Sequence, residues 1–356
     1  MDTVVLTYFS TLRAIRWTRR VYGHLNWEHV GRIEQRKALA ACVPSFDAVD
    51  LDRLARLGFW NEGDCDDLHV LISNASARRQ RRLLKCHLVS RRLPDHAIMK
   101  VDEGVYSASP AYAALQYSYH HELADVFMLL MELLGSYCLA EELTFGIVQD
   151  EGQTSSGNKS DAASACYHVE PAVTLRELQE MAKSIKSSAC RTFKTAVSLA
   201  AADSASPMES VMFGMLGAPM RYGGFGCSGL PKGGMLLNHL IRFDERSRAM
   251  ASGMPYAIMD AYVPAAKTDI EYNGAGHECE NARLHDGQRN NGIRGMGIKV
   301  VVINRDQMKQ VAALEAIARS LYRDAGVRFR CGTSGYRVKQ IAWLNDLRKA
   351  IELNPI

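Results

Sequence analysis

The sequence predicts a mixed α/β protein with two domains, and three observations support this. The chain has 356 residues, enough for two domains that each bury a core. Residues 147–165 lose their hydrophobic periodicity and fill with Ser, Gly, Asp and Asn, a composition typical of a mobile connection. The patterns that follow have the order α-β-β-β-α-β-α. We therefore expect an N-terminal α/β domain over 1–148, a linker and connecting helix over 149–204, and a second domain with C-terminal helices over 205–356.

Composition excludes several classes of protein. Hydrophobic residues make up 47% and charged residues 23% of the chain, which argues against disorder and against a fibrous repeat. The nine cysteines are scattered singly without a CxxC pair, so we expect reduced thiols and no zinc site. The N-terminus lacks the features of a signal peptide, and no apolar stretch reaches the ~18 residues that span a bilayer. We expect a cytoplasmic protein without a membrane partner.

The N-terminal half has the pattern of a mixed α/β domain. Residues 68–74 (LHVLISN) and 85–90 (KCHLVS) are expected to be strands. Apolar residues at helical spacing over 109–134 predict one long helix or two shorter ones. Residues 173–201 predict a helix with a Lys/Arg-rich exposed face that joins the two halves.

Two clusters of basic residues stand out against a net charge of only +4. One lies between residues 78 and 92, and Arg13, Arg16, Arg19 and Arg20 form the other. Such clusters favour a polyanionic partner, here DNA, although a solvated basic face is the ordinary alternative. Contacts to phosphates would leave any sequence preference undefined. The candidate nucleic-acid-binding residues are Arg78, Arg79, Arg81, Arg82 and Lys85.

The second domain is expected to begin with a helix at Pro207, with Ser206 as its N-cap. An apolar stripe marks the buried face of this helix and comprises Met208, Val211, Met212, Met215 and Leu216. The glycine-rich stretch 223–234 lacks the GxxxxGK[ST] motif, so we expect no nucleotide cofactor. The remaining expected elements are strands at 235–243, 256–263 and 268–273, a helix over 277–295, a strand at 299–303 and a helix over 306–324.

Two acidic residues on adjacent expected strands could hold a divalent metal. Asp260 and Glu271 are separated by eleven residues, which suits a short hairpin that brings their side chains together. Alternation along the second strand places Asp269, Glu271 and Asn273 on one face. Whether Asp269 joins the site or faces solvent stays open. Two carboxylates, water and a scissile phosphate would suffice to bind Mg²⁺ or Mn²⁺, which could activate water for hydrolysis.

The order of elements is that of restriction-endonuclease-like cores, and the motifs resemble Vsr-like endonucleases of the PD-(D/E)XK superfamily. The matching segments are Ser206 to Glu209, Asp260 to Pro264, Glu271 to Gly274 with His277, Asp286 with Arg289, and Gly297 to Val300. The N-terminal half resembles the AbiEi-type antitoxin-like region through HVLIS, the arginine run and Tyr106 to Pro110.

This resemblance implies a Mg²⁺-dependent DNA endonuclease that acts in defence or repair. It implies that Asp260 and Glu271 are metal ligands, that Glu209 faces the site, and that His277 is a general acid/base. Glu209 could instead serve only the helix dipole, and exposed acidic strand residues are commonly surface features. Asn273 stands where relatives have Asp and the wider superfamily has Lys, which would weaken or abolish activity.

Two alternatives to an enzyme stay open. Asn273 favours a catalytically inactive antitoxin-like or regulatory DNA-binding protein that kept the fold. A protein-interaction scaffold, in which the basic clusters only confer solubility, is the other. The sequence does not indicate the oligomeric state.

Overall fold

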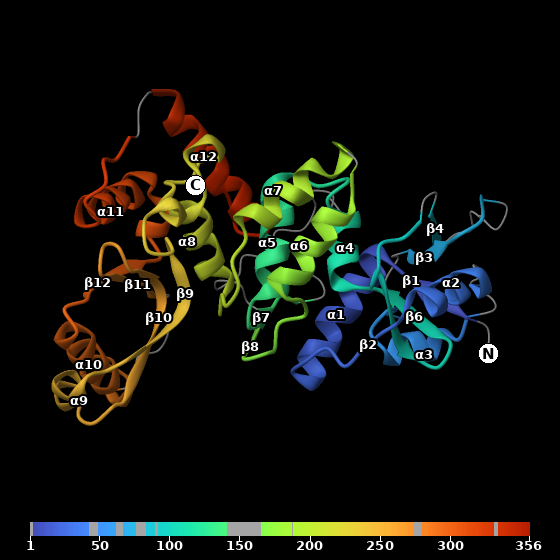
Figure 1. Cartoon of the computed structure of the whole chain (residues 1–356), viewed down its shortest axis with the longest axis horizontal. Helices are drawn as coiled ribbons and strands as arrows, with labels where there is room; N and C mark the ends of the chain where they lie inside the picture. Colours follow the sequence, from blue (N-terminus) through green and yellow to red (C-terminus); the bar gives the residue numbers. More distant parts are fainter. Residues whose placement is uncertain are drawn as a thin grey trace, which may run out of the picture. The chain divides into compact units, whose positions relative to one another are not determined.

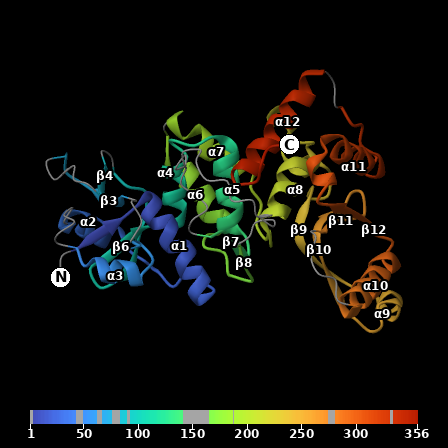
Figure 2. The same ribbon diagram turned by 180° about the vertical axis from the view of Figure 1, so that it is seen from behind.

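A computed structural model describes residues 3–42, 49–61, 67–75, 83–89, 92–140, 165–186, 188–273, 280–330 and 334–356, without the side chains of 280–286 and 334. The protein is mixed α/β, as predicted, and its sheets contain both parallel and antiparallel strand pairs. The chain divides into two compact units, Met1–Ala200 and Ala201–Ile356. Figure 1 labels the elements of both units, and Figure 2 shows them from behind.

The first unit is built on a six-stranded mixed sheet of order β2-β5-β6-β1-β3-β4. Strand β1 runs parallel to β6 and antiparallel to β3, and β3 runs parallel to β4. Both strands expected in this half are present, as β3 and β4. The strands are β1 (Val4–Leu6), β2 (Glu28–His29), β3 (Leu68–Ile72), β4 (Leu84–Leu88), β5 (Ile98–Asp102) and β6 (Val105–Ala108), with β7 (Tyr137–Cys138) and β8 (Cys166–Tyr167) in a separate small sheet.

The helices of this unit decide between the one long helix and the two shorter helices that the sequence left open over residues 109–134. The helices are α1 (Tyr8–Tyr22), α2 (Arg32–Ala41), α3 (Leu51–Arg56), α4 (Pro110–Tyr117), α5 (Leu123–Leu134), α6 (Leu175–Ser184), η3 (Ser188–Cys190) and α7 (Arg191–Leu199). The pattern over 109–134 is therefore two helices, α4 and α5. The single helix expected over 173–201 is wrong: α6 ends at Ser184, whose hydroxyl donates to the Met181 carbonyl, and Ile185 is extended. Helix α6 contacts α4 and α7 contacts α5, so both helices pack within the first unit.

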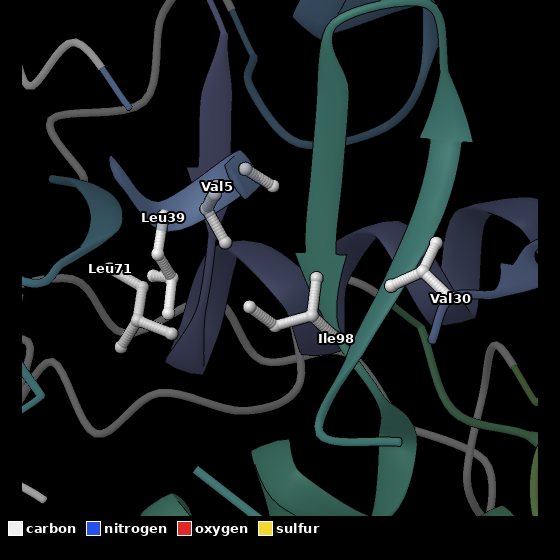
Figure 3. Packing of buried hydrophobic residues seen from close by; sticks show 6 residues of the cluster. Val5, Val30, Leu39, Leu71 and Ile98 are labelled. Carbon is white, nitrogen blue, oxygen red and sulfur yellow. The ribbon is translucent and has the colours of Figure 1, made fainter. Parts of the chain in front are cut away.

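A cluster of buried aliphatic side chains packs α2 against the sheet of the first unit. Val5 comes from β1, Leu71 from β3 and Ile98 from β5, while Leu39 reaches them from α2 and Val30 from just before it. Figure 3 shows Leu39 beside Val5 and Leu71. None of these five side chains is more than 8% exposed, so this is the interior that fixes α2 on the sheet.

Three of the four arginines of α1 contradict the expectation of a basic surface, and the fourth, Arg20, is exposed. Arg13, Arg16 and Arg19 recur every three residues, which places them on one face of the helix, and this face is buried. Arg16 donates from Nε to Glu132 of α5 at 2.7 Å, and its Nη2 forms an ion pair with the same carboxylate. Arg19 donates to the backbone carbonyls of Glu132 and Gly135. These arginines hold α1 against the chain around α5 and are not available to a partner.

The second unit contains a four-stranded sheet of order β12-β11-β10-β9. Strands β9, β10 and β11 form an antiparallel meander, and β12 runs parallel to β11. A helix or strand is present at each position expected between residues 206 and 324, although the last helix begins at Val311 and not at 306, and the helix expected from 277 is described from Glu280. The short helices α9, η4 and η5 are additions. The elements are α8 (Pro207–Gly217), η4 (Met220–Tyr222), η5 (Cys227–Gly229), β9 (Leu236–Arg242), α9 (Glu245–Met250), β10 (Tyr256–Val263), β11 (Thr268–Asn273), α10 (Glu280–Gly295), β12 (Lys299–Asn304), η6 (Gln307–Lys309), α11 (Val311–Asp324) and α12 (Ser334–Lys349).

Helix α8 begins as the sequence predicts and is more deeply buried than it predicts. The Ser206 hydroxyl accepts a hydrogen bond from the backbone N–H of Glu209 at 3.1 Å, which is the expected N-cap. The expected apolar stripe covers one face, yet every residue of α8 is buried. On the far side the indole N–H of Trp343, from α12, donates to the carbonyl of Gly214 at 3.0 Å. Because α8 lies inside the unit, a carboxylate in its first turn is carried into the interior.

The glycine-rich stretch after α8 has a structural explanation. A Cβ at Gly224 would lie 2.0 Å from the carbonyl oxygen of Ala218, so the chain can pass there only with glycine. The backbone N–H of Phe225 donates to the Met215 carbonyl, which ties the loop to α8.

Two further expectations concern membranes and cysteines. Within the described residues no helix has the length and apolar character needed to cross a bilayer. The described cysteines are free thiols, namely Cys42, Cys86, Cys138, Cys166, Cys190 and Cys227.

Candidate functional site

The register of β10 and β11 brings the predicted acidic residues to the same face of the sheet. Ala261 is opposite Ile270 and Tyr262 is opposite Asp269, so Asp260 and Glu271 are the next pair along the two strands. Side chains of opposed residues lie on one face, and alternation adds Asp269 to that face. Regular pairing ends before Asp260, whose Oδ2 instead accepts the backbone N–H of Tyr272 at 3.0 Å. The carboxylate of Asp260, and not a backbone carbonyl, thus accepts the N–H of Tyr272 where the regular pairing of β10 and β11 ends.

Glu209 reaches the same region from α8. Its Oε2 accepts hydrogen bonds from the backbone N–H of Ala205 at 2.8 Å and from Nδ2 of Asn238, on β9, at 2.9 Å. Burial raises the pKa of Glu209, and the negative charge of Glu271 raises it further. Glu209 is therefore hydrogen-bonded to the chain just before its own helix, and it interacts electrostatically with Glu271 and Asp260.

Asp260 lies among like charges. Burial, followed by the negative charges of Glu271 and Glu209, raises its pKa from 3.8 to about 7. The N–H of Tyr272 and the guanidinium of Arg289 act in the opposite direction and only partly compensate. The positive charge of Arg289 therefore offsets only part of the repulsion that the Asp260 carboxylate experiences from Glu271 and Glu209.

Asp269, whose place the sequence left open, belongs to this cluster. It is 0% exposed, and within the described part of the chain neither carboxylate oxygen has a hydrogen-bond partner. Burial raises its pKa to about 10, and the negative charge of the neighbouring Glu271 carboxylate raises it further. Asp269 is therefore protonated at neutral pH.

Arg289 supplies the positive charge of the site. This residue of α10 places Nη2 2.5 Å from Oε1 of Glu271 and 3.8 Å from Oδ2 of Asp269, and it also donates to the carbonyl of Ile258. Its side chain is 16% exposed. The sequence placed Arg289 in a helical motif without a role. The sequence signal that could have indicated its contact with Glu271 is a basic residue on the helix that follows two strands with acidic residues.

Other predicted residues lie outside this cluster or outside the described residues. Asn273 is the exposed last residue of β11 and is in register with Asn304 of β12. His277 lies outside the described residues, as does the side chain of Asp286.

The basic run of the first unit is described only at its end. Arg78, Arg79, Arg81 and Arg82 lie outside the described residues. Lys85, on β4, has a 62% exposed side chain whose Nζ lies 2.5 Å from Oδ2 of Asp67. An acidic neighbour therefore compensates the charge of Lys85.

The cluster contains the kind of donor that a hard divalent cation prefers. Asp260 and Glu271 offer carboxylate oxygens, whereas Asp269 is the buried, protonated member of the cluster. Within the same residues, no three His, Cys, Asp or Glu side chains form a ready-made metal-binding group. Mg²⁺ commonly binds through one or two carboxylates and keeps several waters, so Asp260 and Glu271 could hold it together with water and a substrate phosphate.

Comparison of the chain with protein-family models, curated proteins and solved structures gives no match.

Proposed function

We propose that the second unit is a metal-dependent endonuclease domain that hydrolyses DNA phosphodiesters, with Asp260 and Glu271 as ligands of Mg²⁺ or Mn²⁺. The observation that carries this proposal is the cluster of carboxylates from α8, β10 and β11 on one sheet face. The order α8, β9, β10, β11, α10, β12 supports the proposal, because α-β-β-β-α-β is the order of elements expected from the resemblance to Vsr-like PD-(D/E)XK endonucleases. Defence or repair is the setting that the same resemblance suggests.

The metal, when bound, would polarise a phosphate oxygen and lower the pKa of a bound water. The remaining tasks belong to side chains of this chain. The Tyr272 N–H fixes one oxygen of Asp260 and leaves the other to bind a cation. Arg289 orients Glu271 and places a positive charge where a phosphate would approach. Asp260 must be ionised to act as a ligand, so its raised pKa favours activity above neutral pH.

A cleavage assay tests this proposal. Supercoiled plasmid and single-stranded DNA are incubated with the full chain in Mg²⁺, Mn²⁺ or EDTA. The variants are Asp260→Asn, Glu271→Gln and, as a matched control, Asp306→Asn, whose side chain is 81% exposed. We expect cleavage that requires the metal, disappears in the first two variants and persists in the control. Cleavage in EDTA, or equal cleavage by all variants, would contradict the proposal.

Two observations favour a second candidate, a DNA-binding protein without catalysis. Asn273 is neutral and exposed, and Arg289 already neutralises Glu271 at 2.5 Å. In that case the wild-type protein would bind DNA in a salt-sensitive manner without cleaving it, and binding would survive Asp260→Asn.

A further inference from the structure

A cavity of about 810 Å³ lies in the first unit, far in sequence from the acidic cluster. It is formed by residues at the ends of β3 and β4, at the starts of α1 and α2, along α4, and just after α6 (labels in Figure 1). Pockets for small molecules typically measure ~300–1,000 Å³ and combine apolar walls with a few polar groups. The volume therefore suits a small molecule larger than a single inorganic ion.

The charged groups of this cavity are mainly cationic. Arg32, Arg92 and Lys186 line it, and among the lining side chains that the structure describes Asp95 is the one acidic residue. Arg32 and Asp95 form an ion pair with each other. The charges of Arg92 and Lys186 therefore exceed the acidic charge of the cavity, which favours an anionic ligand.

Aromatic and imidazole side chains are held in place at one side of the cavity. Tyr8 has a left-handed backbone, with φ 52°, where β1 passes into α1. Its ring lies 5.2 Å from that of His69 and 5.3 Å from that of His87, and Nδ1 of His69 is 2.7 Å from Nε2 of His87. A non-glycine residue in this conformation persists only where its surroundings impose it, commonly at ligand sites. Tyr8 and His87 both line the cavity.

The rest of the lining is largely apolar or aromatic, with Gln116, His120 and Ser184 as its polar members. Its apolar and aromatic side chains include Leu71, Leu93, Leu115, Ile185, Tyr112 and Tyr119. Such walls would cover the uncharged body of a ligand, whereas a surface that only attracts a polyanion needs no apolar lining.

We propose that this cavity binds a small organic anion of the size of a nucleoside phosphate. Arg92 and Lys186 neutralise its charge, and its ring lies against the tyrosines and aliphatic side chains. This site is independent of the proposed nuclease activity, because every residue that lines it belongs to the first unit.

Fluorescence anisotropy of methylanthraniloyl-ADP with the full chain tests this inference. Unlabelled AMP, ATP, inorganic phosphate and a short single-stranded oligonucleotide serve as competitors. The variants are Arg92→Ala and Lys186→Ala. Both positions are exposed, and substitutions at exposed positions usually change the free energy of unfolding little. Arg20→Ala, an exposed arginine of α1 outside the cavity, is the control.

We expect saturable binding that AMP or ATP competes away. Arg92→Ala and Lys186→Ala should each weaken it about tenfold, the typical effect of one charge-assisted contact, and Arg20→Ala should leave it unchanged. The absence of saturable binding would overturn the inference. Equal weakening of binding by all three variants would also overturn it. So would a result in which inorganic phosphate or the oligonucleotide competes with the probe as well as AMP and ATP do.

Discussion

Replacing Asp260 by Asn should stabilise the metal-free protein, because the native site holds the Asp260 carboxylate among like charges. Its pKa is raised from 3.8 to about 7, so the folded state binds its proton more tightly than the unfolded state. A raised carboxyl pKa lowers stability as the pH rises from the unfolded to the folded value. The full shift corresponds to about 4 kcal/mol at pH 8, and relaxation of the charged cluster lowers the expected gain to about 2 kcal/mol. Asn keeps the shape and an acceptor for the Tyr272 N–H.

Urea unfolding in EDTA at several pH values measures this effect, with Asp306→Asn as the control. The advantage of Asp260→Asn should be largest at pH 8, shrink as the pH falls through about 7, and vanish below about pH 4. Adding Mg²⁺ should stabilise the wild type and leave Asp260→Asn unchanged, since a ligand stabilises only the state that binds it. An Asp260→Asn variant that is less stable than the wild type at pH 8 in EDTA would refute the reasoning.

Three further predictions follow from buried charges. Asp269→Asn should change the free energy of unfolding at pH 7 by less than about 1 kcal/mol, because Asp269, with a pKa of about 10, is already protonated at that pH. Urea unfolding that shows a loss above about 3 kcal/mol would contradict this expectation. Arg16→Met should lower the free energy of unfolding by about 3–5 kcal/mol in the same assay, since it leaves the carboxylate of Glu132 buried without its ion-pair partner. A loss below about 1 kcal/mol is typical of an exposed ion pair and would contradict this expectation. Burial, followed by the charge of His87, lowers the pKa of His69 to about 3 in the folded protein. Between pH 7 and pH 5 the imidazole gains a proton only in the unfolded chain, so the free energy of unfolding of the wild type should fall by about 1–2 kcal/mol. His69→Gln should remove this component, whereas His24→Gln, at an exposed position, should retain it.

Local chemistry explains why much of the second unit could be predicted. Ser206 and Pro207 mark the start of α8 because a hydroxyl cap and a proline act within one helical turn. Alternation along Tyr256–Val263 gives the buried and exposed positions of β10 directly. These features depend on neighbours a few residues away, so the sequence contains them.

Features that depend on distant partners could not be predicted. The arginine spacing in α1 fits a solvated face as well as a buried one, and the partner of Arg16 is 116 residues away, at Glu132. The sequence showed that Asp269 shares a face with Glu271, but its burial depends on how other elements pack over that face. The hydrogen bond from Asn238 to Glu209 likewise joins β9 to α8 across 29 residues.

Binding of a divalent metal by Asp260 and Glu271 can be observed by anomalous X-ray diffraction from crystals of the full chain grown with Mn²⁺, because the scattering locates the ion itself. We expect an anomalous peak within bonding distance of both carboxylates, and its loss in crystals of Asp260→Asn. Saturating Mn²⁺ with no peak between these residues, or with a peak only elsewhere in the chain, would contradict the proposed metal site.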